Sequence, residues 1–194
     1  MNQLLSVRPS VIDTIVPGTG ILRDILSILG FACFTALCSL LSFWLGPVPI
    51  TGQTLGVLLS GAVLGSRRGA LSQASYLVIG ATGIPFWFAL GGPIGIARLI
   101  GPTAGYLYGF IAMAFIVGWL SERGWYRKIY LSIPAMLAGE IALYFFGLNW
   151  LSMYVPSEKL LQAGLYPFIA GDLLKVMVAG SVLPLCCCAV NRAK

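Results

Sequence analysis

Long apolar runs separated by short polar breaks dominate the chain from residue 25 onward. The first run, Ile25–Leu45, contains 21 residues without a charge, and about 20 apolar residues are enough for a helix to cross the hydrocarbon core of a bilayer. Each later run ends at glycine, proline or charged residues, which interrupt helices. The pattern predicts an all-α integral membrane protein with six transmembrane helices, over residues 25–45, 50–64, 69–82, 101–120, 131–150 and 167–190.

The segments between these runs differ in character. Gly46-Pro47-Val48-Pro49 separates the first two helices, and a polar loop over residues 156–159 precedes the sixth. Residues 83–100 are rich in glycine, proline and aromatic side chains, which favours a structured loop or a partly re-entrant segment. The second and third runs are short, so we expect them to tilt little or to lie partly inside the bundle.

The N-terminal residues lack the continuous apolar core of a signal peptide. We therefore divide the chain into a cytoplasmic N-terminal extension, residues 1–23, and a six-helix membrane domain, residues 24–194. Basic residues orient that domain, because cytoplasmic loops of membrane proteins carry an excess of lysine and arginine. If both termini are cytoplasmic, nine of the twelve lysine and arginine residues lie on the cytoplasmic side: Arg8, Arg23, Arg67, Arg68, Arg123, Arg127, Lys128, Arg192 and Lys194. Arg98 and Lys159 fall on the outer side.

Composition changes this picture little but excludes several classes of function. The 194 residues are 58% hydrophobic and 9% charged, whereas soluble domains carry about a quarter charged residues. The net charge of +6 does not indicate nucleic-acid binding, because there is no basic run or binding motif. The chain has no histidine, and its five cysteines, three of them at 186–188, lack C-x-x-C spacing. We therefore expect no metal site and no cofactor.

Three ionisable residues lie inside the predicted helices, where a charge is costly and usually functional: Glu140, Asp172 and Lys175. Asp172 and Lys175 are three residues apart, so they share one helix face, about 7 and 12 Å below the outer end. We expect a ligand site there, with Arg98 in the outer loop closing over it. The alternative is an ion pair that only neutralises two charges. For Glu140, a structural partner and a ligand contact are both open.

Aromatic and small residues offer further candidates. Tyr76 and the run Phe86-Trp87-Phe88 belong either to an interfacial aromatic belt or to a pocket lid. Glycines at four-residue spacing form ridges that let helices approach closely: Gly52 and Gly56; Gly61, Gly65 and Gly69; Gly101, Gly105 and Gly109. Ala32 and Ala36 form an A-x-x-x-A pattern, which also occurs in ordinary helix packing.

Four segments together resemble the BioY family, the biotin-binding S components of energy-coupling-factor (ECF) vitamin transporters. They stand in family order between about residues 24 and 190: VPITGQTLG at 48–56, YLVIGATGIP at 76–85, GPTAGY at 101–106 and PFIAGDLLK at 167–175. The resemblance implies an S-component bundle of six helices in a prokaryotic cell membrane, with a vitamin pocket near the outer face. It implies no enzymatic activity.

The resemblance also implies roles for individual residues. Asp172 and Lys175 bind the ureido ring of biotin, which fits a ring with two N–H donors and one carbonyl acceptor. Gln53 and Tyr76, in two of the quoted segments, are further substrate-binding candidates. Some members have an arginine at the position of Leu107, which holds the biotin carboxylate, and some have asparagine or arginine in the preceding glycine-rich loop, where this chain has Pro93 and Ile94. This chain departs from those patterns, so Arg98 is the candidate for the carboxylate.

The implied partners are a transmembrane coupling subunit, docked on Ala32 and Ala36, and a pair of ATP-binding cassette ATPases. The chain itself has no phosphate-binding loop, so any ATP dependence must come from such partners. Three alternatives remain open at this point. They are an S component for another small vitamin, an intramembrane lipid-modifying enzyme, and a purely structural subunit.

Overall fold

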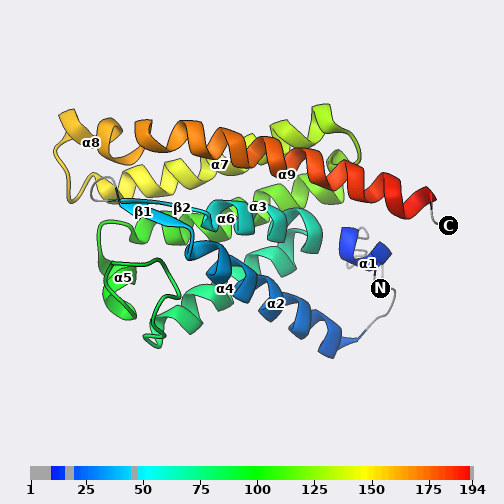
Figure 1. The fold of residues 1–194 in the computed structure, drawn as a ribbon, viewed down its shortest axis with the longest axis horizontal. Helices are drawn as coiled ribbons and strands as arrows, with labels where there is room; N and C mark the ends of the chain where they lie inside the picture. Colours follow the sequence, from blue (N-terminus) through cyan, green and yellow to red (C-terminus); the bar gives the residue numbers. More distant parts are fainter. Residues whose placement is uncertain (1–9, 16–19, 45–47, 193–194) are drawn as a thin grey trace, which may run out of the picture.

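Helices make up most of the computed structural model, which describes residues 10–15, 20–44 and 48–192. Figure 1 shows their arrangement. In chain order the elements are α1 (Val11–Ile15), α2 (Ile21–Ser39), β1 (Ser42–Trp44), β2 (Pro49–Thr51), α3 (Gln53–Leu64), α4 (Ser66–Ala81), α5 (Ile96–Ile100), α6 (Ala104–Glu122), η1 (Trp125–Arg127), α7 (Ile129–Leu151), α8 (Ser157–Gly164) and α9 (Tyr166–Arg192).

The six predicted helices correspond to α2, α3, α4, α6, α7 and α9. On length and composition, four stretches of the described chain suit a membrane span: Ile21–Ser39, Ala104–Glu122, Ile129–Leu151 and Ser157–Pro184. The 12 residues of α3 reach only about 18 Å, well short of a bilayer core. Six complete crossings therefore stay a prediction. Helix α2 begins at Ile21, so Arg23 lies inside it and not in an extension before it.

The first break between helices is a β-hairpin, which the sequence analysis missed. Helix α2 ends at Ser39, before the predicted end, and β1 pairs antiparallel with β2 in the register Ser42 with Thr51 and Trp44 with Pro49. A short apolar run does not by itself distinguish helix from strand. Leu45 and the Gly46-Pro47 part of the break lie outside the described residues, as do Arg8 and Lys194.

Two short helices occupy segments that were predicted as loops. Residues 83–100 do form a structured loop, but it contains α5. The polar loop before the sixth helix contains the amphipathic α8, which starts directly after Pro156. Figure 1 places α5, α8 and the hairpin at one end of the bundle, called here the pocket end. Helix α1 and the last turn of α9 lie at the opposite end.

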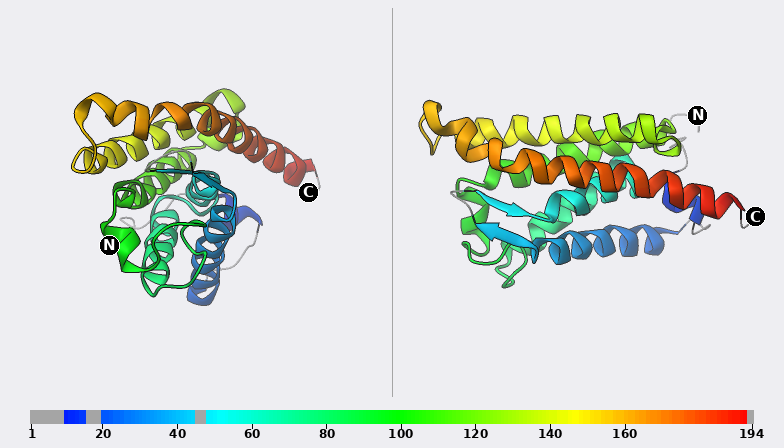
Figure 2. Two further views of the ribbon diagram at one scale, coloured as in Figure 1. Left: turned by 60° about the vertical axis from the view of Figure 1, so that its left-hand side comes forward. Right: turned by 45° about the horizontal axis from the view of Figure 1, so that its top comes forward.

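Helix α6 is the centre of the bundle. It packs against α3, α4 and α7, while α9 packs on α7 and α3, and α2 on α3 and α4. In the apolar stretch of α6, 67% of the residues are buried inside the protein, compared with 11% in that of α2. Both views in Figure 2 agree that α7 and α9 run side by side along one flank. The pocket-end halves of α3, α6, α7 and α9 therefore converge on a shared interior.

Several of the ridge glycines lie where two helices approach closely, whereas Gly101 lies in the turn between α5 and α6. A Cβ atom on Gly61 of α3 would overlap the backbone of Ala114 on α6. One on Gly105 of α6 would overlap the side chain of Trp150 on α7. Small residues at these contacts let the backbones approach, which is how helices gain packing energy within a bilayer.

A charge cluster ties α1 to the end of the bundle opposite the pocket. Asp13 pairs with Arg23 of α2 at 2.8 Å and with Arg68 of α4 at 2.9 Å. Burial alone would raise the pKa of Asp13, but its hydrogen bonds, the strongest of them from Arg68, hold this pKa well below its usual range.

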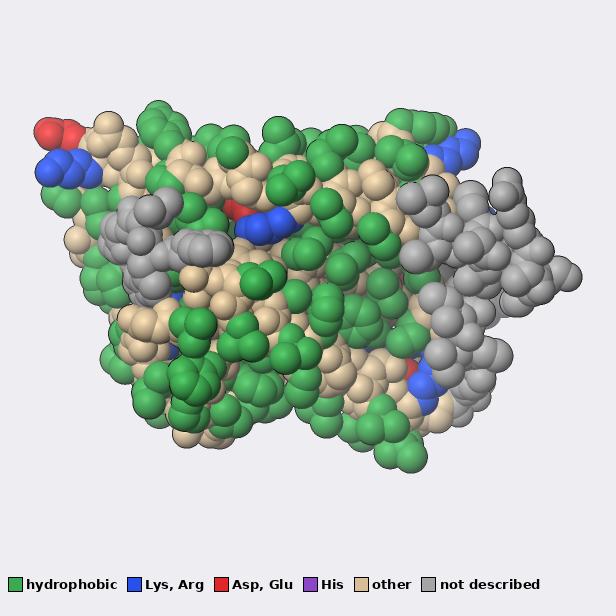
Figure 3. Space-filling view, in the orientation of Figure 1, with side chains coloured by type: hydrophobic (Ala, Val, Ile, Leu, Met, Phe, Trp, Pro, Cys, Tyr) green, Lys and Arg blue, Asp and Glu red, His purple; other side chains and the backbone are tan. Residues whose placement is uncertain are grey.

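In Figure 3 the visible face is mostly apolar, and its charged side chains lie mainly toward the two ends. This is the distribution expected of a protein embedded in lipid.

Candidate functional site

A pocket opens among the β-hairpin, α3, α5, α6, α7 and α9. Its walls combine aliphatic and aromatic side chains with a few polar ones, the usual composition of a small-molecule site. The lining residues are Val48, Pro49, Thr51, Gln53, Thr54, Arg98, Thr103, Tyr106, Leu107, Phe110, Leu143, Tyr144, Phe168, Asp172 and Lys175. Asp172, Lys175, Arg98 and Gln53 were named from the sequence as site candidates, and all four line this one pocket.

Asp172 and Lys175 form an ion pair that also joins three elements. The Lys175 ammonium lies 2.8 Å from Asp172 Oδ1 on the same helix. It also donates to the Thr51 carbonyl of β2 at 2.6 Å and to Thr54 Oγ1 of α3 at 2.9 Å. An ion pair that served only to neutralise α9 would need neither contact. The pair is therefore part of a network across the pocket wall.

Asp172 accepts hydrogen bonds on both of its oxygens. Thr54 Oγ1 donates to Oδ1 at 3.2 Å, alongside Lys175, and the Tyr144 hydroxyl of α7 donates to Oδ2. An ionised carboxylate has about four acceptor sites, so one remains for a further donor. Lys175 has already used its three N–H groups. A ligand carbonyl can reach this ammonium only by replacing one of its present acceptors.

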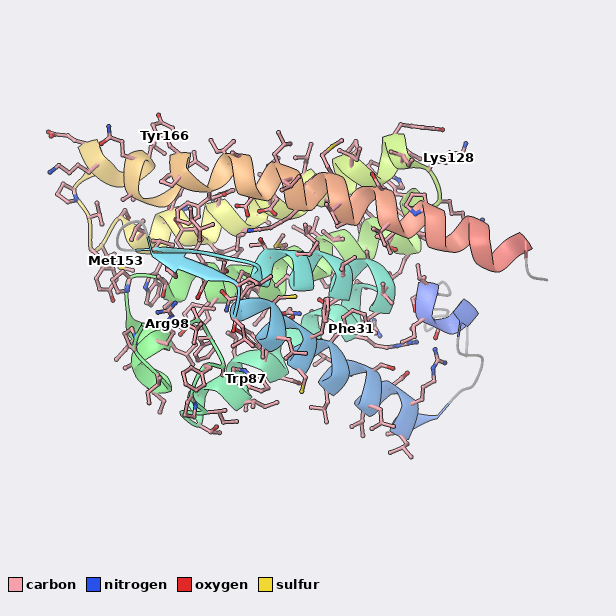
Figure 4. All side chains as sticks on the ribbon, in the orientation of Figure 1. Phe31, Trp87, Arg98, Lys128, Met153 and Tyr166 are labelled. Carbon is pink, nitrogen blue, oxygen red and sulfur yellow. The ribbon has the colours of Figure 1, made fainter. Side chains whose placement is uncertain are left out.

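Arg98 supplies a second positive charge to the pocket. It lies in the last turn of α5 and is 4% exposed. Figure 4 shows it at the same end of the bundle as Met153 and Tyr166, with Lys128 at the other end. The charged lining residues, Asp172, Lys175 and Arg98, sum to one positive charge, which favours an anionic ligand. Leu107 lines the pocket as an apolar residue.

Part of the glycine-rich loop lies away from the pocket. Pro93 and Ile94 are both exposed and do not line the pocket. Arg98 is therefore the guanidinium that the loop region contributes to this site.

Tyr76 differs from the other candidates because it does not line the pocket. Its ring is fully buried and its hydroxyl donates to the Trp87 carbonyl at 2.9 Å. Gln53 donates to the Tyr76 hydroxyl and to the Phe88 carbonyl. Tyr76 thus fixes the loop after α4, and Gln53 connects that loop to the pocket wall.

The three aromatic residues of this loop take different positions. The Trp87 indole donates to the Tyr76 carbonyl at 2.8 Å and stacks on its ring. Phe88 is buried in a slot that a side chain on Gly80 would fill. Phe86 alone is largely exposed. The loop is therefore tied to the bundle by Trp87 and Phe88, and a simple interfacial belt does not describe these two side chains.

Ala32 and Ala36 do not form an open patch on α2. They are 0% and 8% exposed, so the interior of this chain encloses them. The structure favours the alternative of helix packing within the bundle over a docking surface. The small size of both residues explains why the pattern suggested an interface, because close packing inside a protein and between proteins requires the same residues.

Three lining residues that hydrogen-bond to Asp172 or Lys175 were not among the candidates from the sequence: Thr51, Thr54 and Tyr144. The two threonines belong to the VPITGQTLG segment, but a threonine in an apolar run is usually unremarkable. Tyr144 lies one helical turn after Glu140, on the same face of α7. This four-residue spacing from Glu140 was the one indication in the sequence that Tyr144 belongs to the site. It becomes informative only when this face of α7 is known to lie against Asp172.

Comparison with known proteins now assigns the chain to a family. The model of the BioY family matches residues 4–192. The chain belongs to the BioY family. The biotin transporter BioY of Thermotoga maritima is 39% identical over 157 residues, covering 77% of this chain and 88% of the relative. The biotin transporter BioY of Rhizobium etli is 41% identical over 142 residues, covering 69% and 74%.

The fold also has a solved counterpart. It matches the crystal structure of the S-component for biotin from an ECF-type ABC transporter with a TM-score of 0.70 and 24% sequence identity, over 86% of this chain and 93% of that one. This BioY family chain therefore has an S-component fold. With its apolar helices and its transporter relatives, it is a membrane protein.

Proposed function

We propose that this protein is the biotin-binding S component of an ECF-type vitamin transporter in a prokaryotic cell membrane. One observation carries the proposal: in a chain of the BioY family, a single pocket is lined by the Asp172–Lys175 pair, by apolar side chains and by Arg98. The relatives named above are biotin transporters, and the solved counterpart is an S-component for biotin. Biotin combines a polar ring, an apolar tail and a carboxylate, which match the Asp172–Lys175 pair, the apolar walls and Arg98, respectively.

The polar ring of biotin would bind at the Asp172 network. The free acceptor site on Asp172 takes a ureido N–H, while the ureido carbonyl replaces one acceptor of Lys175, such as Thr51. The aliphatic tail packs along Leu107 and Phe110, and Arg98 binds the carboxylate. The negatively charged carboxylate then meets the positive charge of Arg98, and the neutral ureido ring meets hydrogen-bonding partners at the other end.

Orientation follows from the basic residues. The α6–α7 connection carries Arg127 and Lys128, and the start of α4 carries Arg67 and Arg68, all at the end opposite the pocket. By the positive-inside rule this end is cytoplasmic. We infer that both termini are cytoplasmic and that the pocket opens outward. Biotin is captured there and released inward by ATP hydrolysis on partner subunits.

Equilibrium binding of labelled biotin to the purified, detergent-solubilised protein tests this function. We expect saturable binding and competition by desthiobiotin, which keeps the ureido ring and the carboxylate. Lipoic acid, which has a carboxylate tail but no ureido ring, should not compete. Absence of binding by folded protein, or equal competition by thiamine or riboflavin, would reject biotin as the ligand.

The partners in this proposal are a transmembrane coupling subunit and ABC ATPases. Because Ala32 and Ala36 are enclosed, we expect them to act in folding and not as the docking surface. Ala32→Leu should lower the free energy of unfolding by about 1–3 kcal/mol through overpacking. Thermal unfolding in detergent measures this, with Cys33→Leu, at an exposed position of α2, as the matched control. A stable Ala32→Leu protein that binds biotin but no longer co-purifies with the coupling subunit would restore the docking role.

A further inference from the structure

Glu140 is a buried acid that the proposed binding mode does not use. It lies at the middle of α7, eleven residues from either end, which is about 16 Å of helix on each side. It is 5% exposed, and neither carboxyl oxygen has a hydrogen-bond partner. It is not among the lining residues of the pocket. An ionised carboxylate in this position would lose its hydration without compensation.

The charged groups near Glu140 belong to the pocket. Asp172 and Lys175 of α9 interact with it electrostatically. On its own helix, Tyr144 lies one turn closer to the pocket end and donates to Asp172. From α6, the Tyr106 ring packs edge-on against Tyr144, with its hydroxyl donating to the Gly164 carbonyl. Lys175 has given its three N–H groups to other acceptors, so it does not satisfy Glu140.

The charge balance of the pocket depends on whether Glu140 holds a proton. With Glu140 neutral, Asp172, Lys175 and Arg98 leave one positive charge, and an anionic ligand brings the sum to zero. With Glu140 ionised, the sum is already zero, and an anion would leave a negative charge in a poorly solvated interior. The anion therefore binds best to the form in which Glu140 is protonated.

We propose that Glu140 carries a proton whose uptake is linked to the binding of the anionic vitamin. The inference rests on the proposed function for its ligand. The sign follows from linkage: the bound anion favours the protonated carboxyl, so molecules with an ionised Glu140 take up a proton on binding. Affinity is greatest at low pH and falls as pH rises through the titration of Glu140, by up to about tenfold per pH unit.

Binding of biotin to the purified protein between about pH 6 and pH 9.5 tests the proposal, because the ligand carboxyl is ionised throughout this range. Calorimetry at one pH in two buffers with different ionisation enthalpies, phosphate and Tris, counts the protons taken up, because the difference between the two binding enthalpies is proportional to that number. We expect falling affinity and uptake of up to one proton per biotin on the alkaline side. Biotin amide should bind without this dependence, since it brings no charge. A change in the pocket that does not involve the ligand charge would weaken both ligands alike.

Glu140→Gln keeps the size of the side chain and removes its proton chemistry, so its biotin affinity should not vary with pH and its proton uptake should vanish. A flat profile and no proton uptake in the unmodified protein would overturn the proposal, even if the variant fails to fold. So would an unchanged profile in Glu140→Gln. Biotin binding at pH 6.5 stands apart from these outcomes, because its absence would reject the proposed function and not the proton linkage alone.

Discussion

Asp172→Asn is expected to weaken biotin binding by about 10- to 100-fold while the protein stays folded. The substitution keeps the shape of the side chain but removes its charge, and a hydrogen bond to a charged group contributes about 1.5–3 kcal/mol. The substitution also removes the ion-pair partner of Lys175 at 2.8 Å, which adds to the loss. Equilibrium binding of labelled biotin, together with thermal unfolding in detergent, measures both quantities.

Asp24→Asn is the matched control for this substitution. It makes the same chemical change at the opposite end of the bundle, where Asp24 forms a longer pair with Arg68 at 3.5 Å and is partly exposed. Biotin affinity should be unchanged in that variant. If Asp172→Asn also binds biotin as tightly as the unmodified protein, Asp172 does not contact the ureido ring.

The sequence indicated the charged residues that line the pocket but not most of the residues that surround them. Asp172 and Lys175 were identified because charges are rare in apolar helices and because three-residue spacing shares a face. Both inferences depend on one helix only. Thr51 and Thr54 join the same network from β2 and α3, and no local rule places those elements beside α9. Contacts between distant segments depend on how the helices pack.

Tyr76 and Ala32 illustrate the same limit. A tyrosine near a glycine-rich loop suits a pocket wall, yet the Tyr76 hydroxyl is used to hold the Trp87 carbonyl. Small residues on α2 suit a partner surface, yet Ala32 is enclosed by its own chain. In each case the residue type correctly indicated a close contact, but the sequence did not show whether the partner was a ligand, another protein or the chain itself.

Helix positions were predicted well because hydrophobic length is a strong signal in a membrane. The hairpin was missed because Ser42-Phe43-Trp44 continues an uncharged run, and only pairing with Pro49–Thr51 makes it a strand. Helix α8 was missed because its polar residues were interpreted as a loop. Short elements depend on partners more than on their own composition.

Arg98→Ala is expected to weaken the binding of biotin by about 10- to 100-fold and that of biotin amide much less. The reason is that a guanidinium interacts with a carboxylate through charge-assisted hydrogen bonds, and their loss costs about 1.5–3 kcal/mol. Arg98 is buried, so its removal also disturbs packing around α5. The ratio of the two affinities in one variant cancels that disturbance, since both ligands meet the same altered pocket. Competition binding against labelled biotin gives this ratio directly.

Lys159→Ala provides the control, because it removes a positive charge from α8 at the same end of the bundle without touching the pocket. Its two affinities should equal those of the unmodified protein. Arg98→Lys should fall between the unmodified protein and Arg98→Ala, because a lysine keeps the charge but loses the paired geometry of the guanidinium. If Arg98→Ala weakens biotin and biotin amide equally, Arg98 acts on the shape of the pocket. The carboxylate would then have to be neutralised elsewhere, and Lys175 is the other cation that lines the cavity.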